Sequence, residues 1–262
     1  MSKPYLRKLM PVILPAILLL LWEATVRLGE LPLYLLPAPS QILRALLDNH
    51  QVILPHALIT LGEAALGIVI ATGLAALLGI AMDAWPTFRQ AVYPLMVVSQ
   101  SVPIIVLAPL FIIYFGFGLA PKVITVVLMC FFPIAVNLAD GFGQVSHRLV
   151  DLLRTMGATR WDIYRIIKLP AAAPAFFSGL RVAATYSIMG AVVGEWLGGS
   201  GGLGYYMLRV KNAYMLDRVF AIVLLIIVLS LLCNAVVRAV EYLLTPWTRS
   251  RSATPIKEGD NT

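Results

Sequence analysis

Residues 90–121 contain no charged side chain, and this stretch limits the chain to few kinds of fold. A transmembrane helix needs about 20 mostly apolar residues to cross a bilayer core, so the stretch can form one crossing and a turn. The whole chain is 60% hydrophobic and 13% charged, whereas soluble domains are about 45–50% apolar and about 25% charged. A water-soluble fold would expose large apolar patches. We therefore expect an integral membrane protein.

About six segments meet this length requirement, which predicts an all-α integral membrane fold with about six transmembrane helices. The expected spans are residues 9–28, 58–82, 90–121, 123–139, 171–197 and 219–237, the last extending to residue 244. The first span follows a basic prefix, as the apolar part of a signal peptide does, but no small-residue cleavage site follows it. We expect it to remain as an uncleaved helix.

The basic residues outside these spans gather on one side of the membrane. If the N-terminus is inside, most Lys and Arg side chains lie on the inner side, many of them in residues 144–170. Cytoplasmic loops carry such an excess, so we expect both termini in the cytoplasm. The expected organisation is a cytoplasmic N-terminus (1–8), a transmembrane domain (9–247) and a disordered polar tail (248–262).

Several function classes are excluded by what the chain lacks. The net charge of +7 comes without a basic stripe interleaved with aromatic residues, so nucleic-acid binding is not expected. The histidines are scattered and the two cysteines stand alone in apolar stretches, which argues against a metal site or a disulfide. The glycine-rich residues 198–204 lack the Lys-Ser/Thr ending of a phosphate-binding loop. No catalytic residue and no cofactor are expected in this chain.

Residues 144–170 are too polar to span the membrane, yet they have helical periodicity. One face of a first helix carries Leu149, Leu152, Leu153 and Met156. Gly157 can end that helix, Thr159 can cap a second one, and Pro170 predicts a break before the fifth span. An amphipathic hairpin in water either binds a protein partner or lies on lipid headgroups. Physical arguments alone leave both alternatives open.

The same hairpin resembles the loop signature of ABC-importer permeases, written EAA, three residues, Gly, nine residues, Ile-x-Leu-Pro. Asp151, Leu152 and Leu153 occupy the first triplet, where the acid is aspartate and leucines replace the alanines. In that family the hairpin sits in a groove of the ATPase subunit and transmits its closing to the membrane. The resemblance implies that the residues coupling this chain to an ATPase are Asp151, Leu153, Met156, Gly157, Ala158, Trp161, Ile167, Leu169 and Pro170.

Other stretches narrow the resemblance. Residues 36–40 (Leu-Pro-Ala-Pro-Ser), before a short amphipathic helix, and residues 201–204 (Gly-Gly-Leu-Gly) are similar to nitrate, sulfonate and taurine permeases. Residues 99–104 and 130–137 resemble permeases for the pyrimidine precursor of thiamine. This implies a bacterial inner-membrane subunit that pairs with a second copy, two ATPase subunits that bind ATP and Mg²⁺, and an extracytoplasmic binding protein.

Two groups of alternatives to this function remain. The same importer type could carry a sulfonate, taurine, nitrate or riboflavin. A secondary carrier that works without ATP is the other alternative, although no internal inverted repeat favours it.

Polar side chains within the expected spans are candidates for a translocation path, because they are costly in lipid unless they face a cavity or a partner. We expect Glu63, Gln100 and Glu195 to line the path together with Ser99, and Tyr186 or Trp196 to offer a surface for a flat ring. The alternative is structural: Glu195 could cap or anchor a helix end. Pro103 permits a bend in the third span.

Overall fold

The fold was obtained as a computed structural model, which describes residues 4–33 and 35–248, apart from the side chains of residues 4–9, 11 and 12. Every regular element within the described residues is a helix. This confirms the expected all-α class.

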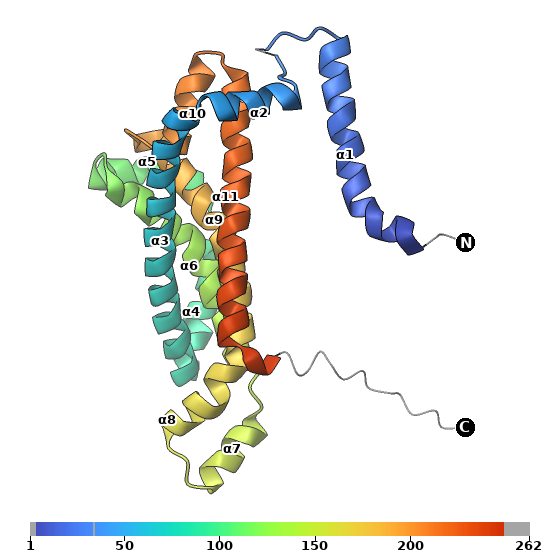
Figure 1. Ribbon diagram of the computed structural model, residues 1–262. Coiled ribbons are helices and arrows are strands. Elements are labelled where there is room, and N and C mark those ends of the chain that lie inside the picture. Colours follow the sequence, from blue (N-terminus) through green and yellow to red (C-terminus); the bar gives the residue numbers. More distant parts are fainter. Residues whose placement is uncertain (1–3, 34, 249–262) are drawn as a thin grey trace.

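Four long helices form the bundle in Figure 1: α3 (His50–Ala84), α6 (Leu119–Gly143), α9 (Leu169–Gly198) and α11 (Leu216–Leu244). Helix α6 packs between α3 and α9. A Cβ atom on Gly179 of α9 would lie 2.6 Å from the carbonyl oxygen of Pro133 on α6. Small residues allow this close approach, which supplies packing contacts where lipid provides no hydrophobic drive between helices.

Within the described residues, four helices are long and apolar enough to cross a membrane, or five if one bent pair counts as a single span. The first expected span, residues 9–28, lies in α1 (Pro4–Leu28), several of whose side chains are outside the described part. The six-span count therefore stays a prediction. Residues 1–3 and the tail from residue 249 onward also lie outside the described residues.

The expected span over residues 90–121 is bent at the place where Pro103 permits a bend. The stretch is divided between α4 (Pro86–Ser99) and α5 (Ile104–Phe115), which meet at an angle of 99°. Pro103 precedes α5 in an extended conformation and has no N–H to continue the helical hydrogen bonds. The charge-free sequence thus forms a broken pair of helices rather than one straight crossing.

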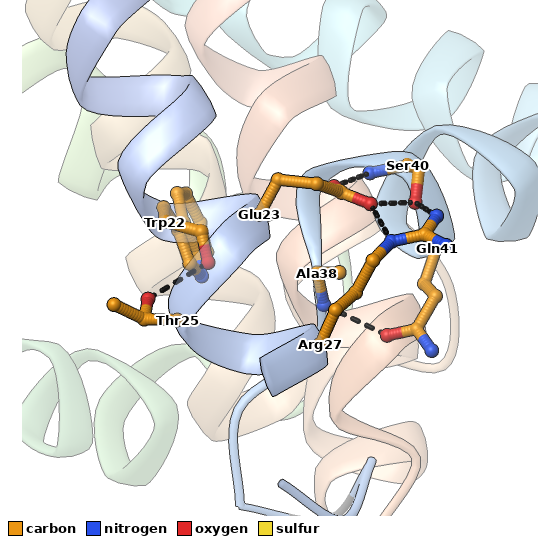
Figure 2. Close-up of polar contacts among 7 residues, drawn as sticks. All are labelled: Trp22, Glu23, Thr25, Arg27, Ala38, Ser40 and Gln41. Atoms are coloured by element: carbon orange, nitrogen blue, oxygen red, sulfur yellow. Dashed lines mark hydrogen bonds and ion pairs between the residues drawn. The ribbon is translucent and has the colours of Figure 1, made fainter. Parts of the chain in front are cut away.

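Helix α1 stands apart from the bundle in Figure 1 and is tied to α2 (Pro39–Asp48), the short amphipathic helix predicted after residue 40. Figure 2 shows the Glu23 carboxylate accepting hydrogen bonds from the backbone N–H of Ser40, at 3.0 Å, and from its hydroxyl, at 2.7 Å. Arg27 donates to both Glu23 and Ser40. The carboxylate therefore caps the start of α2, where an anion is favourable.

The predicted helical hairpin is present at the lower end of the view in Figure 1. Helix α7 (His147–Thr155) ends at a turn in which Gly157 has a φ of +82°, a conformation that suits glycine. Thr159 caps α8 (Arg160–Ile163) by accepting a hydrogen bond from the backbone N–H of Asp162. The two helices and the cap agree with the sequence prediction.

The predicted break at Pro170 is wrong. The chain passes from α8 through a π-helical turn, η1 (Tyr164–Lys168), directly into α9, so one helix runs over Arg160–Gly198. The N–H of Leu169 bonds to the carbonyl of Tyr164, five residues back. Pro170 follows this wider turn, which accommodates the missing proline N–H within the continuous helix. The hairpin is therefore joined to the long helix without a hinge.

Beyond α9 lie α10 (Leu203–Asn212) and, after α11, a short 3-10 turn, η2 (Pro246–Thr248). Helix α10 is at the end of the bundle opposite the hairpin (Figure 1).

Candidate functional site

The hairpin has a small core of its own. Val145, Val150 and Ile163 are buried together, and Leu153, Ala158 and Ile167 pack against them. Three of the residues expected to contact an ATPase, namely Leu153, Ala158 and Ile167, thus face into the hairpin. Their contribution is to hold α7 and α8 at a fixed angle.

A second set of apolar side chains points away from that core. Met156 is 74% exposed and Trp161 is 69% exposed, and Leu149 and Leu152 are about half exposed. Asp151 is also exposed and pairs with Arg154 at 3.4 Å. Leu169 is exposed as well, while Pro170 is half-buried and its carbonyl accepts a hydrogen bond from the Trp247 indole. The hairpin thus presents an apolar face, which is a candidate contact surface for a protein partner or for lipid headgroups.

The sequence placed Leu149, Leu152, Leu153 and Met156 on one face of the first helix, but only Leu153 packs into the hairpin core and the other three are exposed. Both stripes of α7 are apolar, so the helical period alone could not say which stripe packs inward. The contact of Val150 with Ile163 in the hairpin core decides the matter.

Asp83, at the end of α3, connects the hairpin to the bundle. Its carboxylate accepts hydrogen bonds from the Lys168 ammonium, at 2.6 Å, and from the Tyr164 hydroxyl. The Lys168 ammonium also lies 4.8 Å from the centre of the Tyr164 ring, whose edge meets Phe142 of α6. The end of the hairpin is therefore in contact with α3 and α6 and is continuous with α9. Sequence reasoning did not single out Asp83.

The opposite end of the bundle buries charged groups instead. The Lys122 ammonium of α6 lies 2.6 Å from the Glu63 carboxylate of α3, and their side chains are 6% and 4% exposed. Glu195 of α9 is 1% exposed, and it accepts hydrogen bonds from the Thr60 hydroxyl and the Gly204 backbone N–H, both at 2.6 Å. The structure thus brings together Glu63 and Glu195, two of the expected path residues.

The other expected path residues are spread over different surfaces. Ser99 ends α4 and donates to the carbonyl of Leu95, Gln100 is exposed at the break, and Tyr186 is exposed on α9. Trp196 is half-buried, and its indole N–H has no hydrogen-bond partner within the described residues. With Glu195 it lines an open cavity of about 650 Å³ beside loop 198–200 and α10. The path assignment stays a prediction for all six residues.

Arg181, a charged residue within the fifth expected span, pairs with Glu241 of α11 and so joins α9 to α11.

Taken together, several apolar helices, a buried ion pair and a protruding hairpin with an apolar face are the features of a multi-pass membrane protein. Residues 67–250 match the family described as the binding-protein-dependent transport system inner membrane component. The chain belongs to this family. It is the permease subunit of an ABC importer in the inner membrane and not an enzyme.

Most of the chain is matched by known relatives. It is 35% identical to the formylaminopyrimidine transport permease protein ThiX of Halalkalibacterium halodurans, over 96% of this chain and 100% of that protein. It is 30% identical to the riboflavin transport system permease protein RibX of Chloroflexus aurantiacus, over 91% and 87%.

A solved chain of the inward-facing MetNI methionine ABC transporter has the same fold. The TM-score is 0.51 at 21% identity, and the match covers 70% of this chain and 91% of that one.

Proposed function

We propose that this chain moves a pyrimidine precursor of thiamine, similar to formylaminopyrimidine or hydroxymethylpyrimidine, into the cell. The observation that carries the proposal is the 35% identity to a formylaminopyrimidine permease over that protein's entire length. The riboflavin permease is less similar and is matched over a smaller share of its length. Both substrates contain flat heteroaromatic rings, for which Trp196 and Tyr186 offer stacking surfaces.

The chain works in a complex with a second copy of itself, two ATPase subunits and an extracytoplasmic binding protein. The apolar face of Leu152, Met156 and Trp161 supports the ATPase contact, because it loses water only when a partner covers it. ATP and Mg²⁺ belong to the ATPase subunits. The hairpin lies on the cytoplasmic side with both termini, in accord with its many arginines.

Transport follows from a two-state equilibrium that nucleotide binding shifts. ATP binding closes the ATPase subunits and draws the two hairpins together. The unbroken helix over Arg160–Gly198 and the contact of Lys168 with Asp83 pass this movement to α9 and α3. The far end of the bundle then opens to accept substrate from the binding protein, and hydrolysis resets the complex.

The test is transport into liposomes that contain this chain and its ATPase, with the binding protein and the labelled pyrimidine outside. We expect ATP-dependent uptake and ATP hydrolysis stimulated by the loaded binding protein. Uptake without the ATPase would establish a secondary carrier instead. If riboflavin or a sulfonate stimulates ATP hydrolysis and the pyrimidine does not, the proposed substrate is wrong.

A variant of the hairpin turn tests the ATPase contact in the same system. Within the described residues, a Cβ atom at Gly157 meets nothing within 4 Å, so Gly157→Trp makes no steric clash in the isolated chain, although its φ of +82° strains the turn, and the ring fills the partner's groove. Gly157→Ala is the matched control, because alanine carries the same cost of a positive φ but is small. We expect only the tryptophan variant to lose the ATPase subunits. Normal assembly of Gly157→Trp would contradict the role of the hairpin.

A further inference from the structure

The segment before α10 folds inward instead of extending from the end of the bundle. Residues 201–204 are all buried. Three successive backbone N–H groups donate to side chains: Gly202 to Nδ1 of His56 at 3.1 Å, Leu203 to the Thr60 hydroxyl at 2.9 Å, and Gly204 to the Glu195 carboxylate at 2.6 Å.

These acceptors come from two different spans. The first N–H groups of a helix have no partner within the helix itself, so they need acceptors from elsewhere. His56 and Thr60 lie on α3, and Glu195 lies near the end of α9. The Thr60 hydroxyl also donates to Glu195 at 2.6 Å, which makes one connected chain of hydrogen bonds. The start of α10 is therefore fixed to α3 and α9 at once.

The packing around Gly202 and Gly204 leaves no room for a side chain at either position. Gly202 has a φ of +103°, and a Cβ atom there would lie 2.0 Å from an oxygen of Glu195. A Cβ atom on Gly204 would lie 2.4 Å from the carbonyl oxygen of Val192. The His56 ring adds a stacked contact with Tyr206 of α10, with ring centres 5.1 Å apart. The glycines serve close approach to buried polar groups, and flexibility is not their role in this state.

We propose that His56, Thr60 and Glu195 are positioning residues that hold α10 as part of the surface on which the extracytoplasmic binding protein docks. This inference rests on the proposed function for the orientation of the chain and the presence of that protein. Helix α10 carries Arg209 and Lys211 and no acidic residue, so the docking surface of the partner presents acidic side chains.

The same two spans lead from α10 to the hairpin. Helix α3 ends at the other side of the bundle beside Asp83, and α9 continues back into η1 with Lys168, the residue that pairs with Asp83. Docking on α10 therefore acts on the two helices that carry the contact with the hairpin. Such a contiguous network of packed helices and hydrogen bonds is a physical route for coupling between distant sites.

The first experiment measures hydrogen–deuterium exchange in the complete reconstituted complex without binding protein. Thr60→Val keeps the shape of the side chain but removes the hydrogen bonds of its hydroxyl to Glu195 and Leu203, and Thr60→Ser retains the hydroxyl. We expect faster exchange of the amides of residues 202–204 in the valine variant and wild-type exchange in the serine variant. Unchanged exchange in Thr60→Val would overturn the proposed attachment of α10.

The second experiment titrates the binding protein and records the stimulated ATPase rate. We expect Thr60→Val to raise the half-stimulating concentration of binding protein about tenfold, as the loss of hydrogen bonds at a docking surface would. Thr60→Ser should restore the wild-type value. If Thr60→Val lowers only the maximal rate and leaves the half-stimulating concentration unchanged, the residue is merely structural and the proposal is wrong. If the binding protein does not change the ATPase rate of the wild-type complex, the proposed function is wrong. The exchange experiment then still tests the attachment of α10.

Discussion

The hairpin end of the molecule exposes apolar side chains such as Met156 and Trp161, whereas the α10 end buries the charged side chains of Glu63, Lys122 and Glu195. The apolar hairpin face has no cover within the described residues, and burying it against another surface is favourable because water solvates apolar groups poorly. The buried charges already have partners within the chain, and removing one of them leaves the other uncompensated. A substitution at the α10 end should therefore act on the isolated chain, and a substitution on the hairpin face should act on assembly.

The largest effect on the isolated chain is expected from Lys122→Met. The substitution removes the cationic partner of a carboxylate that is 4% exposed, leaving Glu63 charged and buried. Breaking a buried ion pair in this way costs about 3–5 kcal/mol. The free energy of unfolding, measured on the purified chain in detergent micelles, should fall by an amount in this range.

The double variant Glu63→Gln/Lys122→Met is the control for that substitution. It removes both charges, so it should recover most of the lost stability, because the cost arises from the unpaired charge. If the single Lys122→Met variant has the same free energy of unfolding as the wild type, the ion pair does not contribute to stability.

The sequence indicated part of this buried cluster but not its connections. Glu63 and Glu195 stood out because charged residues within apolar spans are uncommon. Lys122 did not stand out, because it lies between the expected spans 90–121 and 123–139. Its contact with Glu63, 59 residues away, depends on how α3 packs against α6. No local pattern encodes that packing, so the ion pair could only be found in the structure.

A smaller effect on the isolated chain is expected from Asp83→Asn, which weakens the link between the hairpin and the bundle. The Asp83 side chain is 10% exposed and that of Lys168 is 19% exposed, so the pair is less buried than Lys122 and Glu63. Leaving a mostly buried polar group poorly paired costs about 1–3 kcal/mol. The free energy of unfolding measured under the same conditions should fall by this amount.

Asp151→Asn is the matched control within the hairpin. Asp151 and Arg154 are both well exposed, and surface pairs of this kind contribute little to stability. Equal losses for Asp83→Asn and Asp151→Asn would mean that burial does not distinguish the two aspartates.

The hairpin shows where local sequence signals succeed and where they fail. The Thr159 cap and the Gly157 turn were predictable, since each depends on a preference of one residue for one backbone position. The break at Pro170 was predicted from a similar local rule and was wrong, because the π-helical turn at Tyr164–Lys168 accommodates the proline. In residues 90–121 the position of Pro103 marked a possible bend, but the angle of 99° depends on the packing of α5.

The smallest effect on the isolated chain, and the sharpest test of the comparison, is expected from Trp161→Ser. Trp161 is 69% exposed, and surface substitutions of this kind change stability by at most about 0.5 kcal/mol. The ATPase subunits should nevertheless fail to co-purify with the variant, because bulky aromatic side chains at interfaces carry a large share of the binding energy. Co-purification and the unfolding free energy are measured on the same preparation.

Ile163→Ser separates loss of the hairpin fold from loss of its surface. Ile163 follows Trp161 by two residues in α8 but is only 4% exposed and belongs to the core of the hairpin. Its substitution should lower stability and assembly together, whereas Trp161→Ser should affect assembly alone. If Trp161→Ser binds the ATPase subunits as the wild type does, the exposed apolar face is not the docking surface. The other alternative for an amphipathic hairpin, contact with lipid headgroups, would then explain that face.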